Sequence, residues 1–224
     1  MQSLPRKLLA CFIFFVGLLP LWASASLVTL HFGERLLQRM QTQFGTDSVQ
    51  RLLDWKQFMT AERDQPEQVM VREVNEYVNR MPFVSDQDHW GQSDYWSTPF
   101  EFFASNGGDC EDFAIAKYYT LISLGVDESR LRLLYAKTAD DAEAHMVLTY
   151  QPPFGSAEES WVLDNLDTRI EALQARTDLT PVYGFNRSGF WMVQANGRQI
   201  LSGRGQDVVM WREVDDRLQA QALL

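Results

Sequence analysis

One unusually apolar segment, residues 109–124 (DCEDFAIAKYYTLISL), sets the strongest constraint on the fold. It follows two glycines, and Gly125 after it predicts a helix that ends there. Lys117 is the only charged side chain after Asp112. Because almost no face of such a helix is polar, we expect it to be buried at the centre of the domain.

The sequence on the two sides of this helix differs in its periodicity. Before it, residues 34–80 carry apolar side chains mostly at helical spacing, and a second helix starts near Pro66. Residues 81–99 read as an aromatic loop, followed by a short helix over 99–104. After it, the pattern predicts five strands and a closing helix: Leu131–Lys137, His145–Tyr150, Ser160–Asn165, Pro181–Phe185, Gly189–Gln194 and Val208–Ala220. Helices first and antiparallel strands later indicate one α+β domain.

The N-terminus has the organisation of a secretory signal peptide. A basic pair opens it, residues 8–22 are apolar or neutral, and the small residues at 23–25 supply a cleavage signal before Ser26. The alternative is an uncleaved membrane anchor, but this stretch is short for a span, which needs about 20 residues. We therefore expect residues 1–25 to be removed and residues 26–224 to form one exported domain.

The chain is acidic and poor in cysteine. It carries 30 Asp and Glu against 20 Lys and Arg, a formal net charge of −10. Such a chain lacks the basic surface that binding to phosphate backbones requires, so we expect no nucleic acid partner. Two cysteines exclude a disulfide-rich scaffold and a cysteine-based zinc site. Since Cys11 lies in the signal peptide, the exported domain keeps only Cys110, which is either a buried small side chain or a reactive thiol.

A nucleophilic role for Cys110 follows from its predicted place in the first turn of the buried helix. The backbone amides and the dipole at a helix N-terminus favour an anion, which would lower the pKa of the thiol. The Cys110 amide could also donate to an oxyanion. A thiol nucleophile needs a base and a group that orients the base. His145 in one predicted strand and Asp164 in the next could supply them.

Each of these assignments has an alternative. A single cysteine is more often a buried hydrophobe, and a strand histidine is more often packed in a core. His31 and His89 compete with His145; we interpret His31 as structural, whereas His89 could line a groove. Asp167 competes with Asp164 for the orienting role. Three aromatic residues before the apolar helix either pack the core or line a substrate groove: Trp90, Tyr95 and Trp96.

Five sequence blocks point to a family: Trp96–Phe102 (WSTPFEF), Gly107–Ala114 (GGDCEDFA), Ala144–Leu148 (AHMVL), Val162–Leu166 (VLDNL) and Pro181–Asn186 (PVYGFN). In this order the chain resembles the bacterial transglutaminase-like cysteine proteinases, and within them the LapG-type periplasmic proteases, over roughly residues 30–195. The resemblance implies a papain-like, transglutaminase-like core with a helical N-terminal part and an antiparallel sheet. It also places the family's catalytic triad on Cys110, His145 and Asp164.

The activity that the resemblance implies is specific. Proteases of this type cleave a large surface adhesin near its N-terminus, at a paired-alanine site, which releases the adhesin and promotes biofilm dispersal. An inner-membrane receptor that senses cyclic di-GMP sequesters the protease. Two other functions stay open: acyl transfer or hydrolysis of a cell-wall peptide by the same triad, and a non-catalytic binding module.

The resemblance further implies dependence on calcium, through acidic residues that fall on Asp109, Glu111 and Asp112. Taken by themselves, Asp109 and Asp112 are also favourable as helix-capping residues. Carboxylates this close to Cys110 should, however, raise the pKa of its thiol. A bound hard cation with oxygen ligands would neutralise them, which is consistent with calcium but does not specify it.

Overall fold

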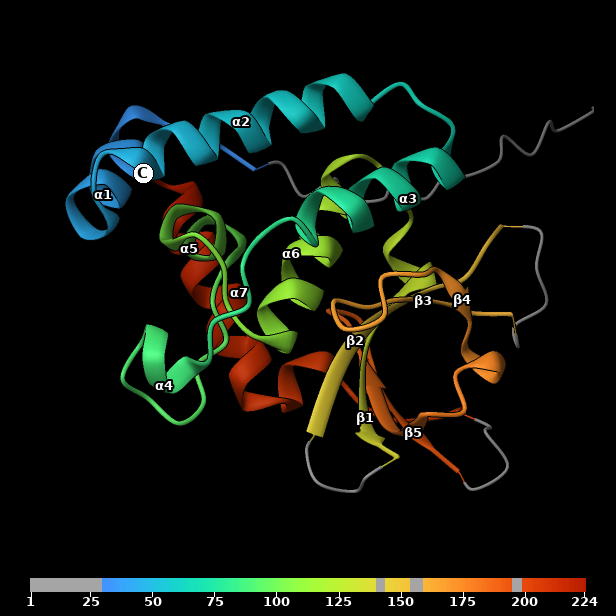
Figure 1. The fold of residues 1–224 in the computed structure, drawn as a ribbon. Helices are drawn as coiled ribbons and strands as arrows, with labels where there is room; N and C mark the ends of the chain where they lie inside the picture. Colours follow the sequence, from blue (N-terminus) through green and yellow to red (C-terminus); the bar gives the residue numbers. More distant parts are fainter. Residues whose placement is uncertain (1–29, 140–143, 154–158, 195–198) are drawn as a thin grey trace, which may run out of the picture.

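Three helices form the N-terminal part of the computed structural model, as the periodicity predicts. They are α1 (Glu34–Phe44), α2 (Asp47–Glu62) and α3 (Glu67–Val78), and α3 starts directly after Pro66 (Figure 1). The structure describes residues 30–139, 144–153, 159–194 and 199–224. The predicted signal peptide, residues 1–25, lies outside them. No helix in these ranges is long and apolar enough to cross a membrane.

A short helix and a tight turn lead into the central helix. α5 (Pro99–Ser105) begins with a capping box in which Thr98 and Glu101 satisfy each other's backbone amides. It ends at Asn106, whose φ of 71° lies in the left-handed region. The predicted aromatic loop before it contains one more short helix, α4 (Asp86–His89).

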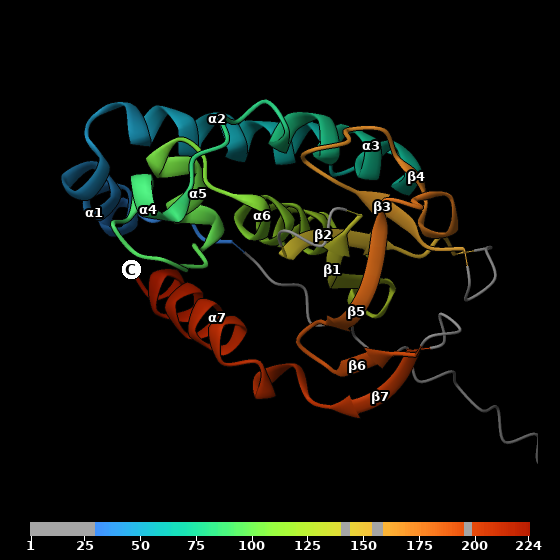
Figure 2. The same cartoon turned by 60° about the horizontal axis from the view of Figure 1, so that its bottom comes forward.

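The apolar segment is the central helix α6 (Cys110–Ser123), and it is buried as expected. Every side chain from Asp112 to Ile122 is buried. Helices α3 and α5 and strands β1 and β2 all pack against it, and Figure 2 shows α6 between the helices and the sheet. Gly125 follows with φ of 99°, so the helix stops at the predicted position.

The C-terminal half forms a seven-stranded sheet in which all neighbouring strands are antiparallel, in the order β4-β3-β2-β1-β5-β6-β7. The strands are β1 (Leu131–Thr138), β2 (Ala144–Tyr150), β3 (Trp161–Leu163), β4 (Glu171–Ala172), β5 (Leu179–Phe185), β6 (Phe190–Val193) and β7 (Gln199–Gly203). Five of them were predicted; the short β4 and the half-exposed β7 were not. β3 is shorter than predicted, so Asp164 lies just beyond the strand end. The closing helix is α7 (Val209–Ala222).

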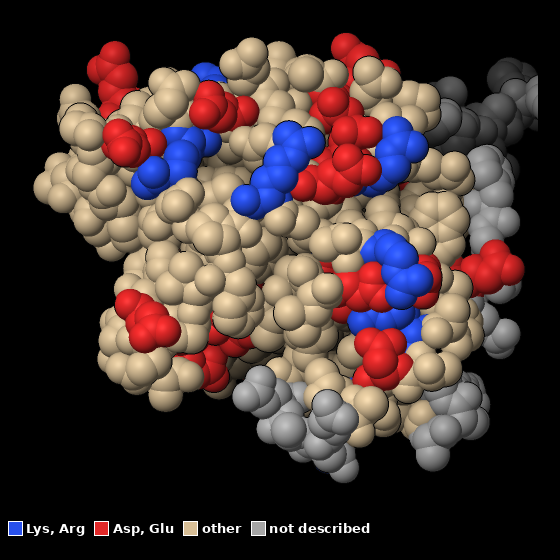
Figure 3. All heavy atoms as spheres, viewed as in Figure 1, with Lys and Arg blue, Asp and Glu red and all other residues tan. Residues whose placement is uncertain are grey.

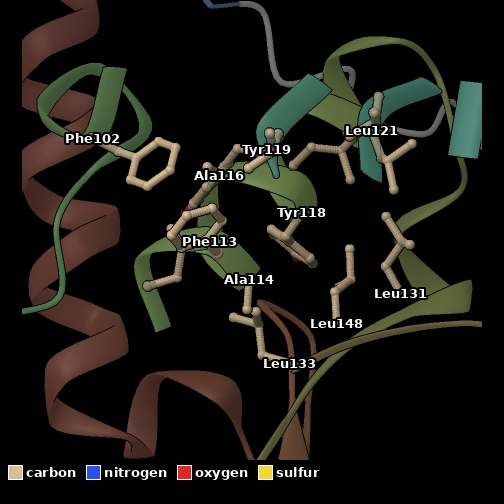
Figure 4. Packing of buried hydrophobic residues seen from close by; sticks show 14 of the residues in the cluster. Phe102, Phe113, Ala114, Ala116, Tyr118, Tyr119, Leu121, Leu131, Leu133 and Leu148 are labelled. Atoms are coloured by element: carbon tan, nitrogen blue, oxygen red, sulfur yellow. The ribbon is translucent and has the colours of Figure 1, made fainter. Parts of the chain in front are cut away.

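The two faces of the sheet differ in what they bury. Leu133 and Leu148 are cross-strand partners whose side chains point toward α6, where Ala114 and Tyr118 meet them (Figure 4). On the opposite face a smaller apolar cluster includes Val147. This alternation, which follows from the period of two along a strand, puts the main core between α6 and the sheet. The α+β class with a helical N-terminal part and an antiparallel sheet is confirmed.

Candidate active site

Cys110 is the first residue of α6 and lies against strand β2, partly buried. Its Sγ donates a hydrogen bond to Glu111 Oε2 over 2.8 Å, and the backbone amide of Met146 hydrogen-bonds the sulfur. Burial raises the pKa of the Cys110 thiol far above its usual value, and the charge of Glu111 raises it further. The helix N-terminus therefore does not lower the thiol pKa here, because burial and the adjacent carboxylate outweigh it.

His145 and Asp164 form a buried pair beside this cysteine. His145 Nε2 lies 2.8 Å from Asp164 Oδ1, and the residue after His145 is the same Met146 that contacts the sulfur. Since an ionised carboxylate only accepts hydrogen bonds, Nε2 carries the proton and Nδ1 is left free to exchange one. The sequence prediction that neighbouring strands β2 and β3 bring these two side chains together is confirmed.

Asp164 has partners on both of its oxygens. Oδ1 also accepts from the backbone amide of Leu166 at 2.9 Å, and Oδ2 accepts from Arg176 Nη2 at 2.8 Å. Burial by itself would raise the pKa of this carboxyl, but His145, the Leu166 amide and Arg176 together hold it well below its usual range. Asp164 is therefore an anion at neutral pH despite being almost fully buried.

The competing residues lie elsewhere. Asp167 pairs with the exposed Arg169 at 2.7 Å instead of with a histidine. His89 ends α4, where its ring lies edge-to-face with the Trp90 ring and the ring centres are 4.6 Å apart. His31 is an exposed residue ahead of α1.

The aromatic residues before α5 mainly pack against other side chains. Trp96 is buried and stacks on Phe185 with ring centres 5.8 Å apart. Tyr95 contacts the Trp90 ring at 4.7 Å and donates to Glu101 Oε2 at 3.3 Å. These contacts favour the core-packing interpretation over a substrate groove.

The two glycines before Cys110 serve the chain's own packing. A Cβ on Gly107, whose φ is 121°, would lie 2.1 Å from the Pro82 carbonyl oxygen. A Cβ on Gly108 would lie 2.1 Å from Asp112 Oδ2. Both positions thus require glycine because backbone and carboxylate approach them closely.

Three carboxylates gather at the start of α6. Oxygens of Asp86, Asp109 and Glu111 lie within 4.8 Å of one another. Figure 3 shows acidic side chains on the corner of the molecule that carries α4. Asp112, the third residue implied by the resemblance, is outside this group: its Oδ1 accepts from the backbone amide of Ser97 at 2.7 Å. Its Oδ2 is buried and has no hydrogen-bond partner among the described residues. Asp86 is in the group instead, and no spacing in the sequence pointed to it, since it lies in the predicted loop.

The donor set fits a hard cation. The Oδ1 atoms of Asp86 and Asp109 are buried and have no hydrogen-bond partner among the described residues. Burial and the nearby charge of Glu111 raise the pKa of Asp86 to about 6 and that of Asp109 to about 9. Oxygen ligands with unbalanced negative charge are what calcium prefers in proteins.

Comparison with known proteins places the chain in a family. Residues 50–185 match the family model described as bacterial transglutaminase-like cysteine proteinase BTLCP. No curated protein matches significantly.

Solved structures of LapG from Legionella pneumophila share the fold. The EGTA-treated form has 32% sequence identity and a TM-score of 0.71, and the match covers 86% of this chain and 98% of that one. The calcium-bound form has 32% identity and a TM-score of 0.67, with 82% and 98% covered. The chain therefore belongs to the bacterial transglutaminase-like cysteine proteinases of the LapG type, with their α+β papain-like core.

Proposed function

We propose that the protein is a calcium-dependent cysteine endopeptidase in which Cys110 is the nucleophile. In this proposal His145 is the base and then the acid, and Asp164 orients and stabilises the imidazole. The observation that carries the proposal is the buried 2.8 Å hydrogen bond between His145 and Asp164, located one residue from the backbone amide that contacts the Cys110 sulfur. Membership of a cysteine proteinase family supports it.

The proposed reaction uses the His145 nitrogen that does not contact Asp164. His145 Nδ1 takes the thiol proton, and the Cys110 sulfur attacks the peptide carbonyl. Amides at the start of a helix have no partner within the helix, so the Cys110 amide can donate to the resulting oxyanion. His145 then protonates the leaving amine, and water hydrolyses the thioester. Asp164 holds the proton-bearing Nε2 throughout and stabilises the imidazolium.

Calcium is the proposed cofactor, held by Asp86, Asp109 and Glu111. When bound, it would neutralise the carboxylates next to the thiol and fix the turn before α6. Two features support this assignment: the unpartnered buried oxygens of Asp86 and Asp109, and the similarity to a LapG solved in a calcium-bound form.

The proposed substrate is the N-terminal region of a large surface adhesin, cut at a paired-alanine site. Its release would promote biofilm dispersal, and an inner-membrane receptor for cyclic di-GMP would control the protease. The proposed location is the periplasm, reached through the cleaved signal peptide of residues 1–25. Support comes from the LapG-type family and from the organisation of the N-terminus.

The experiment is a cleavage assay with purified residues 26–224 and the N-terminal segment of the host's large surface adhesin. We expect one cut, and mass spectrometry of the products should show free carboxyl ends even when a primary amine is added. Conjugates with the amine would favour an acyltransferase instead. No cut, together with a Cys110 that reacts no faster than a free thiol with iodoacetamide, would favour a non-catalytic binding module.

A further inference from the structure

We propose that Arg176 is a positioning residue for the reaction, acting through Asp164. This inference rests on the proposed function. Arg176 Nη2 donates to Asp164 Oδ2 over 2.8 Å, and the Arg176 side chain is only 3% exposed. Exposed ion pairs contribute little to stability, but Arg176 is buried. It binds the oxygen of Asp164 that does not contact His145.

The two oxygens of Asp164 have separate tasks. Oδ1 faces His145 and the Leu166 amide, while Oδ2 faces Arg176. A carboxylate bonded on both oxygens cannot rotate without breaking at least one of these charge-assisted hydrogen bonds. Arg176 therefore fixes the plane of the carboxylate in which Oδ1 points at His145 Nε2.

Arg176 is itself held rigidly. It follows the 3-10 turn Leu173–Ala175, just before β5. Its Nε donates to Asp178 Oδ1 at 2.9 Å and its Nη2 to Asp178 Oδ2 at 2.7 Å. This two-point contact orients the planar guanidinium, which a lysine ammonium could not reproduce. Asp178 thus orients Arg176, Arg176 orients Asp164, and Asp164 orients His145.

A second cation near Asp164 acts differently. Lys117, two turns along α6 from Cys110, is fully buried, and its Nζ has no hydrogen-bond partner among the described residues. It interacts with Asp164 through charge alone. Of these two cations, Arg176 is therefore the one that makes a directional hydrogen bond to the carboxylate.

Losing Arg176 should impair the chemical step more than substrate binding. Without it, Oδ2 is a buried acceptor with no partner, and the carboxylate can turn away from His145. Misplacing the orienting group lowers kcat, whereas KM changes little because Arg176 is buried beneath the site.

The test compares Arg176→Met with a matched variant, Arg169→Met. Arg169 is also an arginine between two carboxylates, Asp167 and Glu171, but its side chain is 71% exposed and it does not touch Asp164. We expect kcat of Arg176→Met to fall about 10- to 100-fold at nearly unchanged KM. Arg169→Met should keep wild-type kcat, and Arg176→Lys should recover part of the loss.

A second measurement separates positioning from stability. The proton on His145 Nε2 should give a downfield NMR signal, assigned by its absence in His145→Ala. We expect Arg176→Met to shift or broaden this signal, and Arg169→Met to leave it unchanged. If Arg176→Met does not fold, Arg176→Gln, which keeps two donors without the charge, takes its place with the same expectation.

Wild-type kcat together with an unchanged imidazole signal in a folded Arg176 variant would overturn the proposal. A loss of activity explained entirely by a smaller folded fraction would overturn it as well. If the wild-type protein cleaves nothing, the proposed function fails, while the imidazole signal still decides whether Arg176 positions His145 through Asp164.

Discussion

The acidic residues near Cys110 form two groups with opposite electrostatic environments. Asp164 is the first group, and Asp86 and Asp109 belong to the second. Asp164 is met by His145 and Arg176, and its pKa lies well below the usual range. Asp86 and Asp109 form no ion pair with any described residue, and their pKa values lie above the usual range. The negative charge of Asp164 is thus balanced by residues of the protein itself. In the other group, no described residue balances the charge of Asp86 and Asp109, so ionising both is unfavourable without a cation. This supports the proposed calcium site.

The largest effect is expected at Cys110, the residue between the two groups. Cys110→Ala removes the proposed nucleophile, and we expect turnover of the adhesin segment to fall by at least about 10⁴-fold with the fold intact. Single-turnover cleavage with excess enzyme measures this, and circular dichroism controls for folding. Substantial cleavage by the alanine variant would remove the thiol mechanism.

A smaller loss is expected when the balanced group is broken. Asp164→Ala deprives His145 Nε2 of its partner and should lower kcat about 100-fold or more. Asp167→Ala is the matched control, because among the described residues Asp167 pairs with exposed Arg169, which also pairs with Glu171. Steady-state kinetics on both variants test the assignment. Equal losses of kcat in both variants, or a greater loss in Asp167→Ala, would show that Asp164 is not the orienting residue.

Breaking the unbalanced group should change the calcium requirement. Asp86→Asn keeps the shape but removes one charged ligand, so the calcium concentration for half-maximal activity should rise about 10-fold or more, equivalent to about 1.4 kcal/mol of binding free energy. High calcium should restore most of the rate. Asp88→Asn is the control, since Asp88 lies on the same short helix, where its Oδ2 accepts from the Ser85 hydroxyl and its backbone amide donates to the Ser85 Oγ. An unchanged calcium requirement in Asp86→Asn would exclude Asp86 as a ligand.

The smallest effect concerns stability at the buried Lys117. Burial lowers its pKa to about 7, although Asp164 raises it in part. Between that value and the ordinary Lys pKa of about 10.4, the unfolded chain binds more protons than the folded one, so this residue makes stability rise with pH. Below about pH 7 the full penalty is present. Lys117→Met should therefore stabilise the protein by more than about 1 kcal/mol at pH 6, with the gain shrinking toward pH 10.

Urea unfolding at several pH values checks this expectation. Lys137→Met, at an exposed position in β1, is the matched control and should show no such trend. A destabilised Lys117→Met at pH 6 would mean that the Lys117 charge is compensated in the fold.

The parts of this site that the sequence predicts are those with a periodic or local signal. The apolar run places Cys110 at the start of α6, and the adjacent segments that carry His145 and Asp164 are read from the strand pattern. Asp86 has no such signal, because only the path of the loop through α4 brings it to Asp109. Arg176 has none either, since it sits in a turn between strands whose course depends on tertiary packing. The two-residue strand β4 is simply too short for a pattern.

Calcium titration by isothermal calorimetry tests the central contrast most directly. We expect chelator-treated wild-type protein to bind one calcium ion and Asp164→Ala to bind it as well. The combined Asp86→Asn, Asp109→Asn and Glu111→Gln variant should not bind it. Cleavage by the wild type should appear with the same calcium dependence. Full cleavage in the presence of EGTA, or equal calcium binding by the triple variant, would overturn the proposed calcium site.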